Sequence, residues 1–460
     1  MEQKNIYLLG IGGIGMSALA RYFIHEGYSV GGYDLTKTPL TERLESEGAE
    51  IHYEDSVELI PSRIKDKEAT KIIYTPAIPK SHTEFNYFLD NGFEVLKRSQ
   101  MLGVLSAGKY VMAVAGTHGK TSTSTLIAWL NHKAEAQGSA VLGGISKNFD
   151  SNLVLGSGAR LTVEADEFDR SFLRLTPDVA VVTSVDADHL DIYGTHKAVK
   201  EAFSQFISLI KAGGAAIIKK GVDVVVNNDD IDVYNYSYNA EADFFARNVE
   251  LIGGALYKYD IVTPSEVIEG CTLGIPGWVN VENSVAAVAS LWCAAKAEGR
   301  ELDSEKIREA LASFSGVKRR FEFWVNSENQ VYMDDYAHHP REIEAALSSV
   351  RAMLPGREIL ALFQPHLYSR TKDLYKGFAE ALSKADRVIL LPIYPARELP
   401  IEGVDEKMIE REMTAPCEVV ERDNLVAHIS KLKTDVVVSF GAGNIDCCCE
   451  PLAELLSTRA

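Results

Sequence analysis

The sequence lacks several features that define large classes of proteins. Residues 6–20 carry no charge, but this stretch is too short to cross a membrane. Four glycines interrupt it, Gly10, Gly12, Gly13 and Gly15, whereas a signal peptide needs a continuous apolar run. We therefore expect no targeting segment, no membrane insertion and a cytoplasmic location.

Positive charge and paired cysteines are also scarce. The 47 basic residues are outnumbered by 65 acidic ones, and the resulting net charge of −18 argues against nucleic-acid binding. The six cysteines form no CxxC pair and have no histidine at zinc-site spacing, so we expect reduced thiols. Hydrophobic residues (46%) and charged residues (24%) occur in the proportions of soluble globular proteins, which excludes a disordered regulator.

Short apolar runs alternate with longer amphipathic stretches, the pattern of parallel sheets covered by helices. This pattern and the length of 460 residues predict an α/β protein with three domains. We expect a Rossmann-like domain over residues 1–106, a central parallel sheet of the P-loop ATPase type over 107–315, and a second Rossmann-like domain over 316–460. The clearest expected elements are strands 6–9, 110–115, 331–334, 359–363, 388–393 and 436–440, and helices 16–26 and 121–137, the latter closed by Gly138.

A glycine-rich turn follows the first expected strand. Gly10, Gly12 and Gly15 form a GxGxxG pattern between a strand and a helix, where backbone N–H groups can approach a pyrophosphate at the helix N-terminus. Asp34 follows the next strand-like run and would hold a ribose in a dinucleotide-dependent dehydrogenase. A close-packed turn without a ligand is the alternative.

A second glycine loop, residues 116–122 with the sequence GTHGKTS, follows strand 110–115 and precedes a helix. It is a shortened phosphate-binding loop, because Val114 stands where the full pattern has its first glycine. Backbone amides of such a loop wrap triphosphate oxygens, Lys120 can neutralise phosphate charge, and the Thr121 hydroxyl can coordinate Mg²⁺. The alternative is a solvated turn that carries a lysine.

Acidic side chains follow two other strand-like runs of the central region. Residues 164–167 read Glu-Ala-Asp-Glu and residues 186–189 read Asp-Ala-Asp-His. Because parallel strands end at one edge of a sheet, these groups should lie near the phosphate loop. An oxygen-rich site with one histidine suits Mg²⁺ or Mn²⁺ better than zinc.

The third region gathers cationic and imidazole groups. Lys318, Arg319 and Arg320 stand at its start, Arg370 follows His366, and the run 334–340 follows the strand 331–334. Arginine suits two-point contacts with phosphate or carboxylate. A helix N-terminus closed by an Asp and a Pro is the alternative for 334–340. The residues thus indicate ATP-driven activation of a nucleotide-linked substrate.

The chain resembles the Mur ligases of peptidoglycan synthesis over nearly its full length. The resemblance rests on Gly10–Met16, Gly116–Ser122, Glu164–Glu167, Asp188-His189, Asn280, Asn283, Arg319-Arg320, Asp335–Pro340 and Phe363–Arg370. It implies that the lactyl carboxylate of UDP-N-acetylmuramate attacks the γ-phosphate of ATP, and that L-alanine displaces phosphate from the resulting acyl phosphate. The implied partners are these three small molecules, and the protein is expected to be a monomer or a homodimer.

The resemblance also implies roles for individual residues, each taken from the matching family motif. UDP-sugar would lie at Gly10, Gly12, Gly13, Ile14 and Gly15, and Mg²⁺, replaceable by Mn²⁺, at Thr121, Glu164 and His189. ATP would contact Gly116, Thr117, His118, Gly119, Lys120, Thr121, Ser122, Asn280, Asn283, Arg320 and Asp335. The amino acid would contact Tyr336, His338 and Arg370, and the catalytic residues would be Lys120, His338, Arg320 and Arg370.

Two positions depart from the family pattern. Trp278 and Val279 replace the Arg and His that often precede the adenine-contacting asparagine, and Leu367 replaces an Arg that often follows the Gln-Pro-His motif. Three alternatives stay open on the sequence. A related ligase that recycles a preformed tripeptide would share most motifs, an NAD-dependent oxidoreductase would explain only residues 10–34, and a non-catalytic nucleotide-binding regulator would need neither Arg370 nor His338.

Overall fold

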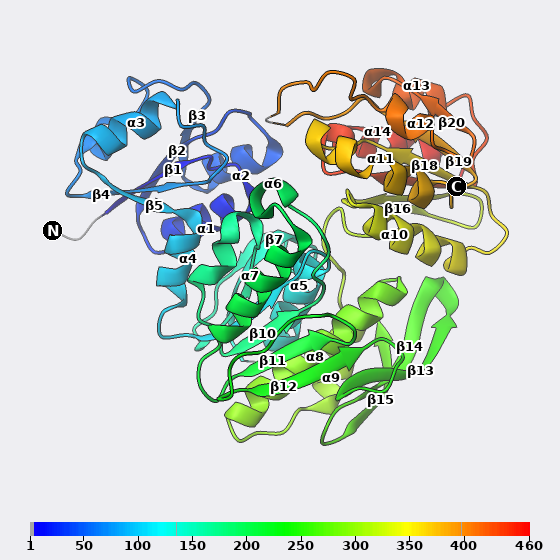
Figure 1. The fold of residues 1–460 in the computed structure, drawn as a ribbon, viewed down its shortest axis with the longest axis horizontal. Coiled ribbons are helices and arrows are strands. Elements are labelled where there is room, and N and C mark those ends of the chain that lie inside the picture. Colours follow the sequence, from blue (N-terminus) through cyan, green and yellow to red (C-terminus); the bar gives the residue numbers. More distant parts are fainter. Residues whose placement is uncertain (1–3, 135, 397) are drawn as a thin grey trace. The chain divides into compact units, whose positions relative to one another are not determined.

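A computed structural model describes residues 4–134, 136–396 and 398–460 (Figure 1). The strands form three sheets, two of them largely parallel and one wholly parallel, so the predicted α/β class is confirmed. The chain divides into two compact units. The first unit comprises Met1–Val249, Tyr259–Gly274 and Glu282–Ser315, and the second comprises Glu250–Lys258, Ile275–Val281 and Gly316–Ala460.

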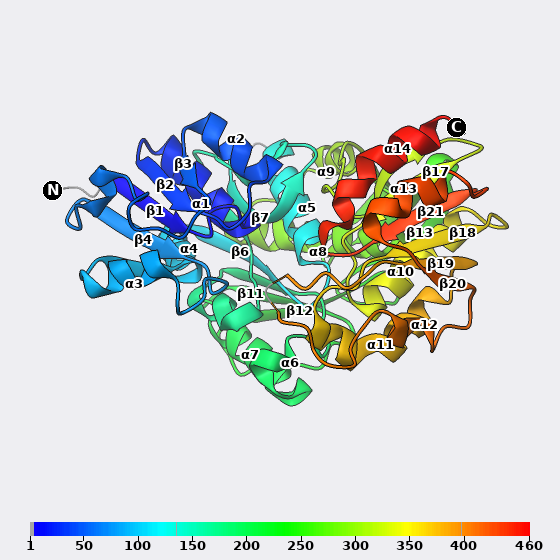
Figure 2. The same ribbon diagram turned by 90° about the horizontal axis from the view of Figure 1, so that it is seen from above.

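The first sheet is parallel, with the strand order β3-β2-β1-β4-β5 (Figure 2). Its strands are β1 (Asn5–Leu9), β2 (Ser29–Tyr33), β3 (Glu50–His52), β4 (Thr70–Tyr74) and β5 (Glu94–Lys97). Its helices are α1 (Ile14–His25), α2 (Pro39–Glu47), α3 (Thr83–Asp90) and α4 (Arg98–Ser106). Apolar residues of α1, α2 and α4 pack on one face and those of α3 on the other, as in a Rossmann-like domain.

The second sheet has the order β15-β14-β13-β12-β11-β10-β6-β9-β7-β8, with a parallel centre from β12 to β7. Its strands are β6 (Tyr110–Ala115), β7 (Ser139–Ser146), β8 (Ser151–Val154), β9 (Arg160–Glu164), β10 (Val179–Val182), β11 (Ala215–Lys219), β12 (Asp232–Ser237), β13 (Phe244–Ile252), β14 (Leu256–Val262) and β15 (Val267–Leu273). Its helices are α5 (Lys120–Lys133), α6 (Leu190–Tyr193), α7 (His196–Ser208), α8 (Trp278–Ala297) and α9 (Ser304–Ala312).

Two helix boundaries differ from the sequence expectations. Helix α1 begins at Ile14, directly after the glycine turn, instead of at Met16. Helix α5 ends at Lys133 instead of Gln137, so Gly138 does not close it. The φ angle of Gln137 is 47°, which no right-handed helix contains. Gly138 comes directly before β7 and lies against Arg160 of β9. The glycine therefore serves the entry into a strand and not the exit from a helix.

The third sheet has the order β16-β17-β21-β18-β19-β20, and its strands β18, β19 and β20 lie side by side (Figure 2). Its strands are β16 (Glu322–Asn326), β17 (Val331–Asp335), β18 (Ile359–Phe363), β19 (Arg387–Leu390), β20 (Cys417–Val419) and β21 (Val436–Phe440). Its helices are α10 (Pro340–Met353), α11 (Tyr368–Leu382), α12 (Lys407–Glu410), α13 (Leu425–Ile429) and α14 (Cys449–Ser457). The four expected strands are present, whereas both edge strands, β16 and β20, were not anticipated.

The fold bears on the expected absence of membrane helices, on the state of the cysteines and on the three predicted regions. In the part of the chain that the structure describes, no helix combines the length and the apolar character that a membrane crossing requires. The six cysteines lie within this part and form no disulfide, as expected. Each of the three sheets falls within one of the three predicted regions, while the proposed boundaries at residues 106 and 315 stay predictions.

Candidate active site

The first glycine turn joins β1 to α1 and is held by backbone hydrogen bonds to the end of β2. The N–H groups of Gly10 and Ile11 donate to the carbonyl of Tyr33, at 2.8 and 3.0 Å. Gly10 has a φ of 83°, which favours glycine. The N–H of Gly12 donates to Oδ2 of Asp34 at 2.7 Å. The carboxylate expected to hold a ribose thus shapes the turn itself.

An arginine missed in the sequence lies against this turn. A Cβ added to Gly15 would come within 2.1 Å of a terminal nitrogen of Arg98, so only glycine leaves room for the guanidinium beside the first turn of α1. Arg98 also pairs with Asp166 at 2.9 Å, and its neighbour Lys97 pairs with Asp169 at 2.7 Å. Two consecutive residues, the last of β5 and the first of α4, therefore bind the chain that follows β9.

The second glycine loop follows β6 and leads directly into α5. Gly116 has a φ of 143°, and a Cβ there would come within 1.9 Å of Oγ1 of Thr183, so no other residue fits. Ser184 accepts the N–H of His118 at 2.8 Å and lies 2.9 Å from the Thr117 hydroxyl. The loop is thereby fastened to the segment after β10, and its curved backbone resembles an anion cradle at a helix N-terminus.

Lys120, the first residue of α5, points back into this loop. Its ammonium group donates to the Gly116 carbonyl at 2.7 Å and pairs with Glu167 at 2.8 Å. Burial alone would favour the neutral amine, but the carboxylates of Glu167, Glu164 and Asp166 raise the pKa of Lys120 well above its usual value. The lysine is therefore positively charged throughout the physiological pH range.

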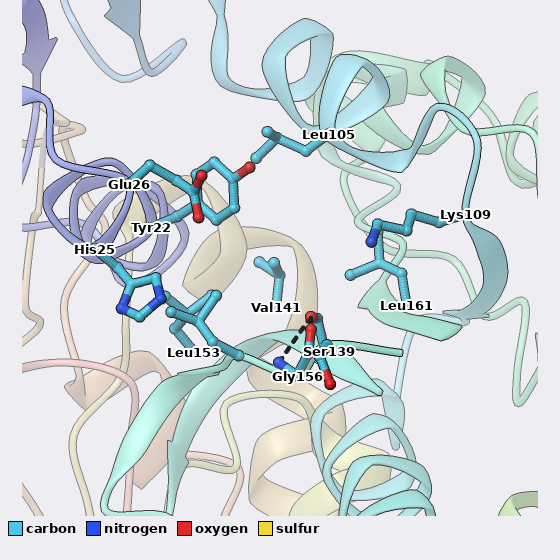
Figure 3. A pocket seen from close by; sticks show the side chains of 12 residues that line it. Tyr22, His25, Glu26, Leu105, Lys109, Ser139, Val141, Leu153, Gly156 and Leu161 are labelled. Carbon is cyan, nitrogen blue, oxygen red and sulfur yellow. Dashed lines mark hydrogen bonds between the residues drawn. The ribbon is translucent and has the colours of Figure 1, made fainter. Parts of the chain in front are cut away.

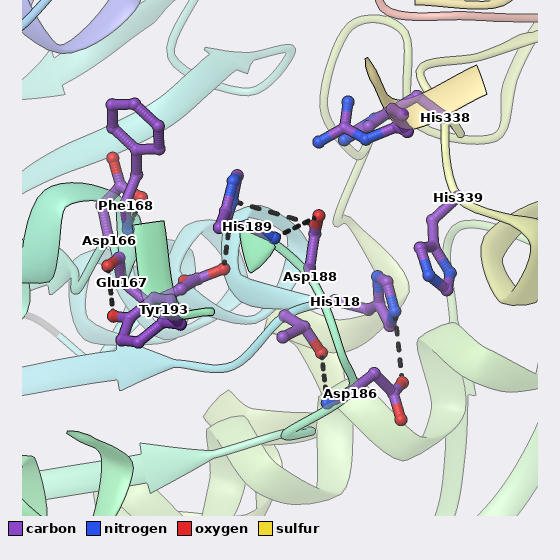
Figure 4. A network of polar contacts seen from close by, with 12 residues as sticks. His118, Asp166, Glu167, Phe168, Asp186, Asp188, His189, Tyr193, His338 and His339 are labelled. Carbon is purple, nitrogen blue, oxygen red and sulfur yellow. Dashed lines mark hydrogen bonds and ion pairs between the residues drawn. The ribbon is translucent and has the colours of Figure 1, made fainter. Parts of the chain in front are cut away.

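The strand-end acids meet at this edge of the sheet, as predicted. Val114 of β6 pairs with Glu164 of β9, and Ala115 of β6 pairs with Val182 of β10, so the three strands end side by side. Figure 4 shows the resulting network, in which Nε2 of His189 lies 3.8 Å from carboxylate oxygens of both Glu167 and Asp188.

One of the predicted metal ligands, Glu164, has a carboxylate oxygen that is available to a cation. Oε2 of Glu164 is buried and has no hydrogen-bond partner, so it is suited to a cation. Glu164 is the last residue of β9, and Thr121 lies in the first turn of α5. His189 belongs to the same polar network as Glu167. Among the described residues, no group of three or more His, Cys, Asp or Glu side chains is arranged to hold a metal. These residues fit Mg²⁺, which usually keeps water and phosphate oxygens as its other ligands.

The loop histidine has an acidic partner. Nε2 of His118 lies 3.2 Å from Oδ2 of Asp186, and the backbone N–H of Asp186 donates to the Thr117 hydroxyl at 3.1 Å (Figure 4). Of the two predicted nucleotide-binding asparagines, Asn283 accepts from Thr123 of α5 at 3.2 Å. Asn280 donates to the Pro276 carbonyl at 2.7 Å, next to the positions that depart from the family pattern.

In the second unit, the run from Asp334 to Pro340 both ends β17 and begins α10. The helix is capped by His339 and not by an Asp, with Pro340 in its first turn, so the capping alternative is correct for the proline and wrong for the capping residue. Asp335 lies before them, accepts the N–H groups of Phe321 and Ala337 at 2.8 Å each, and has its pKa raised to about 6 by burial.

The predicted amino-acid ligands gather at the ends of β17 and β18. Nδ1 of His338 lies 3.0 Å from the Tyr336 carbonyl, and the Arg320 guanidinium stacks over the Tyr336 ring at 5.0 Å. Arg370, in the first turn of α11, lies 3.4 Å from Nδ1 of His366. Tyr336, His338 and His366 are linked by ring contacts of 5.4 and 6.4 Å between neighbours. The structure therefore brings this part of the predicted set together.

A pocket of about 480 Å³ lies apart from these residues (Figure 3). It is formed by the carboxyl end of α1, the end of α4 and the residue Lys109 after it, and the β7–β9 region. Its lining mixes aliphatic side chains, such as Leu105, Val141 and Leu161, with polar ones that include Tyr22 and Lys109. None of the predicted site residues lines it.

Comparison with known families decides the identity of the fold. Residues 5–110 match the model "Mur ligase family, catalytic domain", residues 114–291 match "Mur ligase middle domain", and residues 319–443 match "Mur ligase, glutamate ligase domain". The chain belongs to the Mur ligase family. The three matches follow one another over most of the chain, so the resemblance noted in its motifs is confirmed.

Several Mur ligases are similar over nearly their full length. The UDP-N-acetylmuramate–L-alanine ligase of Phocaeicola vulgatus is 46% identical over 447 residues, 96% of each chain, and that of Porphyromonas gingivalis strain W83 is 45% identical over 460 residues, 99% of each chain. Among solved structures, the UDP-N-acetylmuramate–alanine ligase of Thermotoga maritima has a TM-score of 0.82 at 24% identity, covering 99% of this chain and 100% of that one. A murein peptide ligase of Psychrobacter arcticus has a TM-score of 0.71 at 21% identity, covering 99% of each chain. The solved structures show the three-domain fold.

Proposed function

We propose that this Mur ligase joins L-alanine to the lactyl carboxylate of UDP-N-acetylmuramate, with conversion of ATP to ADP and phosphate. The relatives that bear the name of this activity are 45–46% identical over almost the whole chain. The observation that carries the proposal is the charged, partly buried Lys120, held at the mouth of a phosphate-binding loop near Glu164, whose Oε2 has no hydrogen-bond partner. An NAD-dependent oxidoreductase would have no use for this lysine.

We assign the substrates to the ends of the strands. The turn of Gly10, Gly12, Gly13, Ile14 and Gly15 binds the UDP-sugar pyrophosphate, where Arg98 adds a guanidinium. Residues 116–122 bind the ATP phosphates, and Asn280, Asn283, Arg320 and Asp335 contact the rest of the nucleotide. The residues Tyr336, His338 and Arg370 bind alanine. Thr121, Glu164 and His189 hold Mg²⁺, which when bound neutralises phosphate charge.

The reaction has two steps in this proposal. A lactyl carboxylate oxygen attacks the γ-phosphorus, the bond to the β-phosphate oxygen breaks, and ADP leaves. The alanine nitrogen then attacks the acyl carbon, phosphate leaves, and the nitrogen loses a proton to form the amide. Negative charge grows on the phosphoryl oxygens in the first step, and Lys120, placed at the loop before α5, stabilises it. Arg320 offsets the same charge, and Arg370 orients the amine through the alanine carboxylate.

The test is phosphate release from Mg-ATP with UDP-N-acetylmuramate and each amino acid added in turn. We expect turnover only when both UDP-N-acetylmuramate and L-alanine are present, because the sugar's carboxylate accepts the phosphoryl group. Steady turnover with a preformed tripeptide and none with alanine would assign the chain to the recycling ligases. The Lys120→Ala variant serves as the inactive control. Release of phosphate without the UDP-sugar would contradict the proposed order of steps.

A further inference from the structure

A largely buried chain of polar side chains lies in the first domain and plays no part in the proposed chemistry. It consists of Glu84 in α3, Tyr7 in β1 and His52 at the end of β3. The Tyr7 hydroxyl lies 2.7 Å from Oε2 of Glu84 and 2.6 Å from Nε2 of His52. Nδ1 of His52 lies 2.9 Å from the Glu54 carbonyl. Glu84 is fully buried and Tyr7 is likewise inaccessible to solvent.

One proton can be shared between Glu84 and His52, the two ends of this polar chain. The Glu54 carbonyl can only accept, so Nδ1 of His52 must carry a hydrogen to bond it. If Glu84 is protonated, it donates to Tyr7, and the Tyr7 hydroxyl donates to a neutral His52. If the proton leaves the chain, the single Tyr7 hydrogen faces two acceptors, Glu84 and His52, and one short contact loses its hydrogen. Complete bonding therefore requires the proton.

Burial favours Glu84 over His52 as the residue that holds this proton. Burial raises the pKa of Glu84 to about 7, while Tyr7 and the N–H of Ser56 partly oppose this shift. Burial lowers the pKa of His52. Asp55, the nearest other carboxylate, caps α3 through the N–H groups of Thr83 and Glu84.

Two further titratable side chains, His82 and Tyr33, lie near the polar chain. Nδ1 of His82 lies 3.2 Å from Asp55, and the His82 ring stacks edge-on against Tyr33 at 4.5 Å. The Tyr33 ring in turn lies 5.8 Å from the His52 ring. Burial lowers the pKa of His82 and raises that of Tyr33, so it disfavours the charged form of both rings.

The polar chain is joined to the first glycine turn by two hydrogen bonds. The backbone carbonyl of His52 accepts the N–H of Asp34 at 3.2 Å. The Asp34 carboxylate then accepts the N–H of Gly12 at 2.7 Å. A path of hydrogen bonds thus runs from His52 through Asp34 to the glycine turn.

We propose that Glu84 and His52 are positioning residues which share one proton through Tyr7, and that this proton keeps Asp34 against the glycine turn and strengthens UDP-sugar binding. The proposal rests on the proposed assignment of that turn to the UDP-sugar. Loss of the proton leaves the phosphate loop and Lys120 untouched. The effect therefore falls on the KM for UDP-N-acetylmuramate and not on kcat at saturating substrate.

The test compares two variants that fix the chain in opposite states. In Glu84→Gln the side-chain amide donates to Tyr7 permanently, as the protonated acid does, and its carbonyl still accepts from Ser56. In Tyr7→Phe the hydroxyl that joins Glu84 to His52 is absent, and only the direct contact of 3.4 Å between Nε2 of His52 and Oε1 of Glu84 remains. Glu58→Gln is the matched control, because Glu58 is exposed in the same loop region and forms no bond in the described part of the chain.

Binding of UDP-N-acetylmuramate by calorimetry and the KM values are measured between about pH 6 and about pH 8.5. In the natural protein and in Glu58→Gln, we expect affinity to fall about threefold to tenfold as pH rises, the equilibrium effect of one hydrogen bond. Glu84→Gln should keep the tight value and Tyr7→Phe the weak value at every pH. A natural protein without pH dependence, or a dependence that survives in Glu84→Gln, would overturn the proposal.

A readout without substrate separates this proposal from the proposed function. The infrared C=O band of a buried carboxylic acid should disappear with an apparent pKa of about 7 in the unliganded natural protein and be absent from Glu84→Gln. If this band titrates but UDP-N-acetylmuramate does not bind at any pH, the assignment of the glycine turn is wrong and the affinity part of the proposal falls with it. If the band does not titrate while the sugar binds, the shared proton is wrong and the function stands.

Discussion

The Lys120 ammonium lies 2.8 Å from Oε2 and 3.0 Å from Oε1 of Glu167, whose side chain is only 1% exposed. A buried carboxylate thus holds the lysine at the loop before any phosphate arrives. Because the same ammonium donates to the Gly116 carbonyl, its position is defined by two partners on different elements. The phosphate loop is therefore charged and preorganised in the unliganded protein.

We expect Lys120→Ala to lower kcat by on the order of 10² or more, because a preorganised donor aimed at the transferred phosphoryl group is lost. Steady-state kinetics with all three substrates measure this effect. Lys197→Ala, a change of an exposed lysine on α7, is the control and should leave kcat unchanged. Near-normal turnover of Lys120→Ala would show that the loop is only structural.

Glu164→Gln should raise the Mg²⁺ concentration needed for half-maximal activity. Its unpartnered Oε2 is the cation ligand in the proposed site, and loss of even an indirect partner of a metal typically weakens binding about 10- to 100-fold. Titration of activity with Mg²⁺ measures the change. An unaltered metal requirement would remove Glu164 from the site.

A second variant perturbs the same carboxylate from outside. A Cβ at Gly143 of β7 would come within 2.1 Å of Oε2 of Glu164, so Gly143→Ala must displace the Glu164 side chain. We expect the metal requirement to rise in this variant too. Gly253→Ala is the control, since a Cβ at Gly253 meets nothing within 4 Å.

Arg370→Lys should lower kcat/KM for alanine by roughly 10- to 150-fold, equivalent to about 1.5 to 3 kcal/mol, because lysine cannot hold both carboxylate oxygens. The KM values for ATP and UDP-N-acetylmuramate should stay nearly constant. Lys372→Gln, on the same helix, is the control for charge. An effect spread equally over the three substrates would exclude an alanine clamp.

Asp335→Asn should change the pH dependence of stability. The folded-state pKa of Asp335, about 6, lies above its ordinary value of 3.8, so the folded protein binds the proton more tightly than the unfolded one. Stability from this group is full below about pH 3.8 and is lost as pH rises through about 6. We expect the variant to gain on the order of 2 to 3 kcal/mol relative to the natural protein over that interval.

Urea unfolding of the two proteins at several pH values measures this difference. Because Asn accepts only one of the two N–H groups that Asp335 accepts, the variant should also lose some stability at every pH. The change with pH is therefore the decisive quantity. Asp373→Asn, at an exposed site on α11, should show no such change. A constant difference between Asp335→Asn and the natural protein would mean that Asp335 titrates normally.

The sequence predicted the elements whose signals are local. Both glycine turns, the lysine at the start of α5 and the carboxylates after β9 and β10 are specified by neighbouring residues, and parallel pairing then places them at one edge. The end of α5 was missed because Gly138 was expected to close the helix, whereas the helix ends at Lys133 and Gly138 lies directly before β7.

Residues that act through distant partners could not be predicted. Arg98 follows an ordinary strand, and its place beside Gly15 becomes visible only once α4 packs next to α1. Asp34 was expected to hold a ribose, whereas in the unliganded fold it accepts from Gly12. Glu84 and His52 are separated from Tyr7 by tens of residues, so no motif could join them.

The adjacent pairs Lys97–Asp169 and Arg98–Asp166 have a consequence for anyone who wishes to divide this protein. A cut near residue 106 follows the expected domain boundary, yet it takes Lys97 away from Asp169 and Arg98 away from Asp166, a carboxylate whose charge acts on Lys120. A central fragment made in this way would carry surplus negative charge at the place meant for triphosphate, and would repel the ligand it was made to study. A central fragment that keeps its charge balance must therefore include Lys97 and Arg98 as well as the central sheet.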